Sequence, residues 1–167
     1  SGTTRVSQAL AQLGYEVTSS DISAWSEVFA TCYLKSKKSD TFYQEILGHL
    51  NNLKGHDGWY TKHYGGELCE KKHPFQVKNT RKLDAIRDEI EKLNLVWEDK
   101  CVILTSLIYA LDSVDSTLGH YVAYLSDWSP RSHNDLFLKL PKRFNSSGKH
   151  HILRGDIFET IHNHEYD

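Results

Sequence analysis

The chain has 167 residues, of which 39% are hydrophobic and 25% are charged, so it can bury the core of a domain and is not disordered throughout. Its formal net charge is −2, which excludes a globally basic nucleic-acid binder. No apolar run approaches the roughly 20 residues of a membrane helix. The sequence has no methionine, and we expect it to be part of a longer protein.

The first 34 residues predict a loop, a helix, a strand and a second helix. Val6, Ala9, Leu10 and Leu13 recur at helical spacing, and Gly14 is a helix stop signal. Residues 15–18 alternate as a short strand does. The second helix has one apolar face, formed by Trp25, Val28, Phe29, Cys32 and Tyr33. We expect the two tryptophans on helical apolar faces, Trp25 and Trp97, to lie in the core.

The middle of the chain is predicted to be mainly helical. Helices are expected from Asp40 or Thr41 to Leu50, from Asn79 or Thr80 to Leu93, and over 97–114. A further short helix is predicted over 117–125, whereas residues 54–80, rich in Gly, His and Lys, indicate an extended loop. Towards the end, residues 151–153 form a strand candidate, Gly155-Asp156 a turn, and Ile157 the start of another helix.

Two aspartates occupy the same context, because Asp21 and Asp156 each follow a strand candidate and precede a helix. Side chains at the carboxyl ends of parallel strands line the ligand crevice of doubly wound folds, so these acids suit a nucleotide-like cofactor. Each could equally be a helix cap, a position that Asp favours. Gly2, Thr3 and Thr4 precede the first helix, whose N-terminal N–H groups favour anionic groups.

Charge is unevenly distributed, since residues 129–155 carry six Lys and Arg residues against Asp135 alone. This segment is either a solvated loop or a site of phosphate contact. The three cysteines are far apart without a CxxC pair, and the paired histidines His162 and His164 do not share a helix face. We therefore expect a reducing environment and no metal site.

Four motifs in order resemble the Dam-like class of N6-adenine DNA methyltransferases. The opening Ser1-Gly2-Thr3-Thr4 resembles its Phe-x-Gly-x-Gly motif, and Ser19-Ser20-Asp21-Ile22 follows. The run 114–121 is similar to Val-x-Asn-Thr-x-Gly-x-Tyr, and Gly155-Asp156-Ile157-Phe158 looks like the third cofactor motif. Helical segments like 79–93 and 104–125 are also common in the family.

The resemblance implies an α/β fold: an incomplete class I methyltransferase (Rossmann-like) core with a large, mainly helical insertion. Residues 1–34 and 151–167 would form the core, and 35–150 the insertion with the DNA-recognition region. The cofactor would be S-adenosylmethionine and the partner double-stranded DNA, with no membrane partner, in a monomeric cytoplasmic protein of bacterial or phage type.

The resemblance also implies site residues. In the cofactor site, Gly2 to Thr4 approach the methionine part, Asp21 holds the ribose, and Asp156 contacts the adenine; the full set is Gly2, Thr3, Thr4, Asp21, Ile22, Asp156, Ile157 and Phe158. The expected DNA contacts are Thr117, His120, Tyr121, Arg131, Lys139, Lys142 and Arg143, and Ser116 also borders the target site.

The chain departs from the family pattern at several positions. Thr4 replaces the second motif glycine, Ser7 replaces another small residue, and Ser116 replaces Asn. The catalytic Pro-Pro-Tyr motif is not among the three separated prolines, so we expect it beyond Asp167 and no catalytic residue within the chain. The alternatives are a non-catalytic DNA-binding or regulatory relic of this fold, and a methyltransferase acting on RNA or a small molecule.

Overall fold

The computed structural model describes residues 1–67, 73–120, 123–145 and 148–160. They form two compact units built from interleaved stretches of chain. The first unit comprises Ser1–Tyr43, Val96–Thr105 and Pro141–Asp167, and the second comprises Gln44–Leu95 and Ser106–Leu140. The chain therefore leaves the first unit and returns to it twice.

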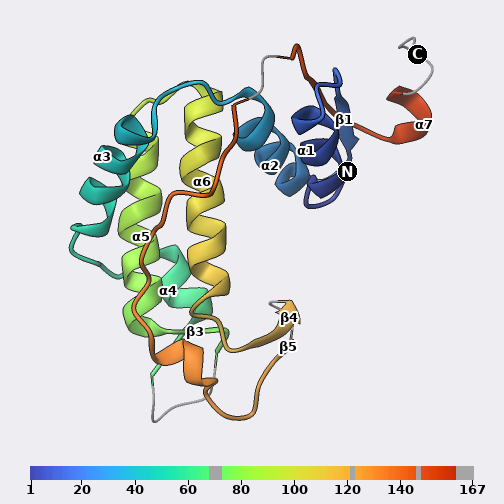
Figure 1. The fold of residues 1–167 in the computed structure, drawn as a ribbon. Coiled ribbons are helices and arrows are strands. Elements are labelled where there is room, and N and C mark those ends of the chain that lie inside the picture. The colour runs from blue at the N-terminus through green and yellow to red at the C-terminus, as the bar shows by residue number, and fades with distance from the viewer. Residues whose placement is uncertain (68–72, 121–122, 146–147, 161–167) are drawn as a thin grey trace. The chain divides into compact units, whose positions relative to one another are not determined.

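The first unit is built on a two-stranded parallel sheet (Figure 1). Strand β1 (Thr18–Asp21) pairs with β6 (His151–Arg154), with Thr18 opposite His151 and Asp21 opposite Arg154. The strand predicted over 15–18 is thus displaced towards the C-terminus, whereas the prediction for 151–153 is confirmed. Pairing with β6 places the polar run Ser19-Ser20 inside the strand, because tertiary pairing overrides weak strand propensity.

Helices α1 (Arg5–Gln12) and α2 (Ala24–Lys35) pack beside this sheet. As predicted, α1 stops before Gly14, which takes a φ of +91°. A small core joins them to the sheet, formed by Ala11, Val17, Ala30 and Leu34 with Phe144 and Ile152 packed against it.

The buried face of α1 is not the apolar stripe that its sequence suggests. The buried residues are Ser7, Gln8 and Ala11, whereas Val6 and Leu13 are 74% and 75% exposed. The Ser7 hydroxyl donates a hydrogen bond to the buried Ser19 hydroxyl of β1 at 3.4 Å. Trp25 and Trp97 are also about half exposed, so the prediction that they lie in the core is wrong.

The predicted long helices are confirmed as α3 (Asp40–Asn51), α5 (Val77–Lys92) and α6 (Trp97–Asp112). Helices α3 and α6 contribute residues to both units. In the second unit the buried apolar side chains come from these helices and the segments beside them, and include Leu47, Leu50, Leu83, Ile86, Ile90, Leu107 and Leu138.

Residues 54–80 are more ordered than the loop that their composition suggests. They contain the short helix α4 (Trp59–Tyr64) and the parallel pair β2 (Gly65–Gly66) and β3 (Phe75–Gln76). A buried carboxylate organises α4, because Asp84 of α5 accepts the N–H groups of Tyr60 and Thr61 at 2.8 and 2.9 Å. Such a long-range cap leaves no local sequence signal.

The helix predicted over 117–125 is wrong, because this stretch forms an antiparallel hairpin of β4 (Thr117–His120) and β5 (Ala123–Tyr124). Gly119 has a φ of +98° and its N–H donates to the Thr117 hydroxyl at 3.2 Å. The Ser116 N–H donates to the Pro74 carbonyl at 2.8 Å. These local and long-range hydrogen bonds compete successfully with the helical ones.

Two asparagines fix the path of the chain after η1 (Pro130–His133). Asn79 donates to the Asn134 carbonyl and accepts from the Leu136 N–H, at 3.0 and 2.9 Å. Asn51 bonds both backbone groups of Leu138, at 3.0 and 2.8 Å. Each side-chain amide therefore satisfies a donor and an acceptor of an extended segment, as a neighbouring strand would.

Candidate functional site

The two aspartates singled out by the sequence lie at the same edge of the sheet. Asp21 is the last residue of β1, and Asp156 follows β6 by two residues, before α7 (Ile157–Thr160). The strands are parallel, so their carboxyl ends coincide, and the Gly155 N–H donates to the Asp21 carbonyl at 3.1 Å. This is the edge at which ligands bind in open α/β sheets.

The N-terminal turn is tied to the Asp21 carboxylate. Its Oδ2 accepts a hydrogen bond from the Gly2 N–H at 2.7 Å, and its Oδ1 accepts from the Ser23 N–H at 2.9 Å. These two N–H groups stabilise the charged carboxylate over its protonated form. Asp21 is therefore a carboxylate at neutral pH, able to accept but not to donate.

The motif's two glycine positions both adopt left-handed backbone. Gly2 has a φ of +53° and Thr4 a φ of +63°. A β-branched residue pays for this conformation in steric strain, of order 1–3 kcal/mol. Thr4 is fully buried, and its hydroxyl accepts from Gln8 Nε2 at 2.9 Å and donates to the Thr3 carbonyl at 2.7 Å. The departure at Thr4 thus keeps the turn that glycine would form.

The capping alternative separates the two aspartates. Asp156 caps α7, since its Oδ1 accepts the Phe158 N–H at 2.9 Å and its carbonyl accepts from Thr160. The cap of α2 is instead Ser23, whose hydroxyl accepts the Trp25 N–H at 3.3 Å. Asp21 accepts from the Gly2 N–H and from the N–H of Ser23, the N-cap residue of α2, so it joins the N-terminal turn to the start of that helix.

Large apolar side chains follow each aspartate and face solvent. Ile22 is 73% exposed, and Ile157 and Phe158 are 50% and 79% exposed. Apolar side chains line most of a ligand pocket, where they cover the apolar faces of the ligand. The residues predicted for cofactor binding therefore lie together, on the N-terminal turn and the two strand ends.

The residues predicted to contact DNA divide into two groups. Thr117, His120 and Arg131 belong to the hairpin region of the second unit, and Tyr121 lies outside the described residues. Thr117 is buried and its hydroxyl donates to the Asp115 carboxylate. Arg131 lies 2.6 Å from Asp115 Oδ1 and donates from Nε to the Asp115 carbonyl at 3.1 Å. Both side chains hold the base of the hairpin.

Ser116 has a structural role in the same region. It is buried, and its hydroxyl accepts the Ser129 N–H at 3.0 Å. His120 lies further along the hairpin and is exposed, with Nδ1 accepting the Ala123 N–H at 3.2 Å. Of the described residues in this group, His120 and Arg131 are exposed, the latter with 46% of its side chain accessible.

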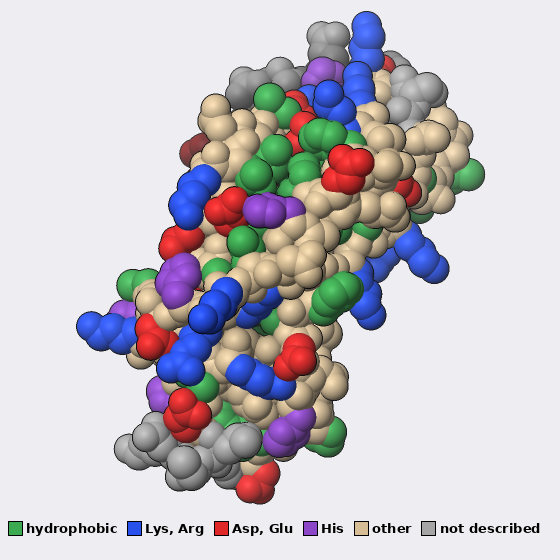
Figure 2. All heavy atoms as spheres, turned by 90° about the vertical axis from the view of Figure 1, so that its left-hand side faces the viewer, with side chains coloured by type: hydrophobic (Ala, Val, Ile, Leu, Met, Phe, Trp, Pro, Cys, Tyr) green, Lys and Arg blue, Asp and Glu red, His purple; other side chains and the backbone are tan. Residues whose placement is uncertain are grey.

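The basic residues after the hairpin also differ from one another. Lys139 and Lys142 are exposed, whereas the Arg143 side chain is 10% exposed and bonded to Ser36, Lys38 and Asp40. The face shown in Figure 2 mixes basic, acidic and histidine side chains. A basic surface must therefore be sought in particular clusters, not across the whole molecule.

An aromatic cluster on α4 was not anticipated from the sequence. Trp59 is 58% exposed, and its ring lies 4.6 to 5.7 Å, between centroids, from those of Tyr60, His63 and Tyr64. Their spacing at i, i+1, i+4 and i+5 is the signal that would have found the cluster, had α4 been predicted.

The thiols of the two described cysteines, Cys32 and Cys101, are buried. Burial raises the pKa of Cys32 to about 11 and that of Cys101 to about 12; Cys69 and the histidines after 160 lie outside the described residues. Among the described residues, no group of three or more His, Cys, Asp or Glu side chains could hold a metal ion. No helix in the same part of the chain is long and apolar enough to cross a membrane.

The whole chain matches one family model, and it belongs to the D12 class of N6 adenine-specific DNA methyltransferases, with residues 1–167 matched. Modification methylase StsI of Streptococcus sanguinis is 32% identical over 163 residues, which cover 88% of this chain and 24% of that protein. Type II methyltransferase M.NlaIII of Neisseria lactamica is 26% identical over 153 residues, which cover 89% of this chain and 46% of that protein. No solved structure matches the chain.

The family assignment confirms the resemblance seen in the sequence. The mixture of helices and short strands is consistent with an α/β fold, and the family implies a Rossmann-like core. The chain spans less than half the length of these curated relatives.

Proposed function

We propose that this chain supplies the cofactor-binding and DNA-contacting parts of an enzyme that transfers a methyl group from S-adenosylmethionine to N6 of adenine in DNA. The observation that carries the proposal is the assembly of Gly2, Asp21 and Asp156 at one sheet edge, in a chain matched by this family over its whole length. The catalytic Pro-Pro-Tyr motif is proposed to follow Asp167 in the longer protein.

The residues at the sheet edge fit S-adenosylmethionine in chemistry. The ribose offers hydroxyl donors, and Asp21 is an ionised acceptor with a side chain 20% exposed. A Cβ built on Gly2 meets nothing within 4 Å, so the turn leaves room beside its backbone. Ile22, Ile157 and Phe158 present apolar surface for the two faces of an adenine ring.

Each residue then has a defined task. Asp21 holds the ribose hydroxyls, Asp156 accepts from the adenine amino group, and the turn at Gly2 to Thr4 approaches the methionine part. When bound, the cofactor supplies an electrophilic methyl group on a sulfonium. The chain's own contribution is binding and orientation, which lower the barrier by presenting that group in a fixed position.

The DNA partner is proposed to be double-stranded, with the target adenine flipped from the helix at a cost of a few kcal/mol. His120 and the basic residues Lys139 and Lys142 are exposed and available for DNA contact. The assigned residues bind and position, so we expect the 167-residue chain alone to transfer no methyl group to DNA. Radiolabelled methyl transfer by the purified chain would contradict this division of labour.

The cofactor assignment is tested by calorimetric titration of S-adenosylmethionine into the chain and its Asp21→Asn variant. We expect the variant to bind about 10- to 100-fold more weakly, because a hydrogen bond to a charged group contributes about 1.5–3 kcal/mol. Asp135→Asn, on an exposed side chain of the second unit, is the matched control and should bind as the unaltered chain does. Equal affinity of Asp21→Asn and the control would refute the assignment.

A further inference from the structure

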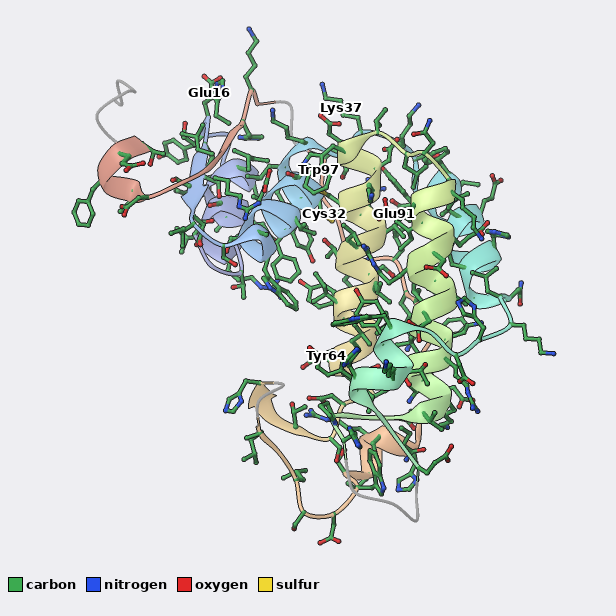
Figure 3. All side chains as sticks on the ribbon, turned by 180° about the vertical axis from the view of Figure 1, so that it is seen from behind. Glu16, Cys32, Lys37, Tyr64, Glu91 and Trp97 are labelled. Atoms are coloured by element: carbon green, nitrogen blue, oxygen red, sulfur yellow. The ribbon has the colours of Figure 1, made fainter. Side chains whose placement is uncertain are left out.

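A pocket of about 390 Å³ lies within the first unit, between two segments distant in sequence. One wall is the connection from α2 to α3, residues 36–40, and the other is residues 143–145. Lys37 lies on the first of these segments (Figure 3). The second wall belongs to the basic stretch 129–155, whereas the first wall lies about a hundred residues earlier in the chain.

The walls are strongly basic. Lys37, Lys38 and Arg143 line the pocket and Asp40 is its one acid, while Lys35 and Lys142 adjoin the two walls in sequence. The rest of the lining is mainly polar, with hydroxyls of Ser36 and Ser39 and the amide of Asn145. Hydroxyls, amides and ammonium groups are the side chains that contact phosphate oxygens in DNA.

Arg143 holds the two walls together. Its Nη1 donates to the Ser36 hydroxyl at 3.0 Å, and its Nη2 donates to the Lys38 carbonyl at 3.1 Å and to the Asp40 carboxylate. The guanidinium lies 4.4 Å from the centre of the Tyr43 ring. Tyr43 is in turn fixed by donating to Asp99 at 2.6 Å. The loop carrying the lysines is therefore held in a defined position.

The lysines, by contrast, project from this frame. Lys37 and Lys38 are exposed, and within the described residues neither forms an ion pair. The Lys38 ammonium lies over the Phe42 ring, 5.5 Å from its centre. Asp40 cannot neutralise both lysines, because its carboxylate is bonded to Arg143.

We propose, resting on the proposed function, that this pocket binds the phosphodiester backbone of DNA, with Lys37 and Lys38 as the phosphate contacts. Arg143 acts through the lysines by holding their loop. The one aromatic residue of the lining, Phe144, packs against the small core of the first unit, and the rest of the lining is polar or charged, so we expect the contact to be independent of DNA sequence. It adds positive charge from the α2–α3 connection to the basic segment that follows the hairpin.

The test measures binding of a fluorescein-labelled DNA duplex to the 167-residue chain by anisotropy, over a range of NaCl concentrations. The double variant Lys37→Gln/Lys38→Gln should bind about eightfold more weakly per lost contact at 0.1 M NaCl, with the slope of log affinity against log salt smaller by about 2. Lys92→Gln, which removes one charge from an exposed lysine of α5, is the control and should leave the slope unchanged.

A second variant should change the affinity for DNA in the opposite direction. Asp40→Asn removes the pocket's acid, so it should tighten duplex binding and steepen the salt dependence. An unchanged slope in the lysine double variant, or an unaltered chain that binds no duplex at low salt, would overturn the proposal. Competition by polyglutamate as effective as that by DNA would also overturn it, since an acidic polypeptide would then be the partner.

The cofactor titration separates this proposal from the proposed function. If the lysine variants leave DNA binding unchanged while S-adenosylmethionine still binds, only the proposed phosphate contact of the pocket is refuted. If the unaltered chain does not bind S-adenosylmethionine, the proposed function is refuted, regardless of the result for the lysine variants.

Discussion

Each unit contains a glycine close to an aspartate, and the two pairs differ in how much space lies beside the glycine. In the second unit a Cβ on Gly58 would lie 2.6 Å from the Asp84 carboxylate, which is buried and bonded to Tyr60 and Thr61. In the first unit a Cβ on Gly2 would meet nothing within 4 Å, although Gly2 donates its N–H to Asp21.

The contrast distinguishes Asp84, whose carboxylate is buried and bonded within the fold, from Asp21, whose carboxylate remains partly exposed. Gly58 is needed for close packing, so that Asp84 can cap α4. Gly2 is needed for its backbone conformation, with φ at +53°, and leaves open space on the side where a Cβ would point. Asp84 is buried, whereas the Asp21 side chain is 20% exposed, so of the two carboxylates Asp21 is the one that a ligand can reach.

The largest expected effect is on the packed pair. Gly58→Ala should lower the free energy of unfolding by about 2–3 kcal/mol, because the methyl group overlaps the Asp84 carboxylate and displaces the cap of α4. Gly2→Ala should cost only about 1 kcal/mol, from the left-handed backbone. Urea unfolding of both variants gives the comparison, and equal losses would erase the distinction between the pairs.

Variants of Thr4 test whether the left-handed backbone of the N-terminal turn costs stability when the residue has a Cβ. Thr4→Gly and Thr4→Ala both lose the hydroxyl bonded to Gln8, but only alanine retains a Cβ at a φ of +63°. The glycine variant should therefore be the more stable of the two by about 1 kcal/mol, the reverse of the usual order. Thermal unfolding decides it, and an alanine variant as stable as the glycine variant would contradict the assigned strain.

The smallest expected effect concerns His150, a third titratable group packed against a glycine. A Cβ on Gly148 would lie 2.7 Å from its ring, and Nδ1 accepts the Val17 N–H at 3.2 Å. Burial is the main cause that lowers the pKa of His150 from 6.5, with His151 and Lys35 adding to it and Glu16 opposing it. The folded state thus resists protonation.

Stability should therefore be fully present above about pH 6.5 and decline as the pH falls below it, since the unfolded chain binds the proton more readily. His150→Asn, whose side-chain oxygen can accept the same N–H, should flatten this decline in urea unfolding at several pH values. His133→Asn, on an exposed histidine, is the control and should retain it. A decline of the same size in both variants would show that His150 is not the group that causes the loss of stability at low pH.

Much of the helical structure could be predicted because its signals are local. The apolar spacing of 83–93 and 101–111 and the stop at Gly14 are read within a few residues, and α5, α6 and α1 follow them. The wrong secondary-structure predictions concern segments whose hydrogen-bond partners are distant in sequence. Pro74 and Ser129 bond to Ser116 at the base of the hairpin, and Asp84 caps α4 within a stretch predicted to be a loop.

The sequence by itself determined the family, the presence of acids at two strand ends and the existence of a basic stretch, because these reside in residue identity and order. The tertiary structure decided which of those residues have room to act. Parallel pairing of β1 with β6 brings Asp21 and Asp156 to one edge, while the fold's own hydrogen bonds engage Thr117, Arg131 and Arg143. It also placed Lys37 and Lys38 beside residues 143–145, because contact across a hundred residues depends on packing and not on local pattern.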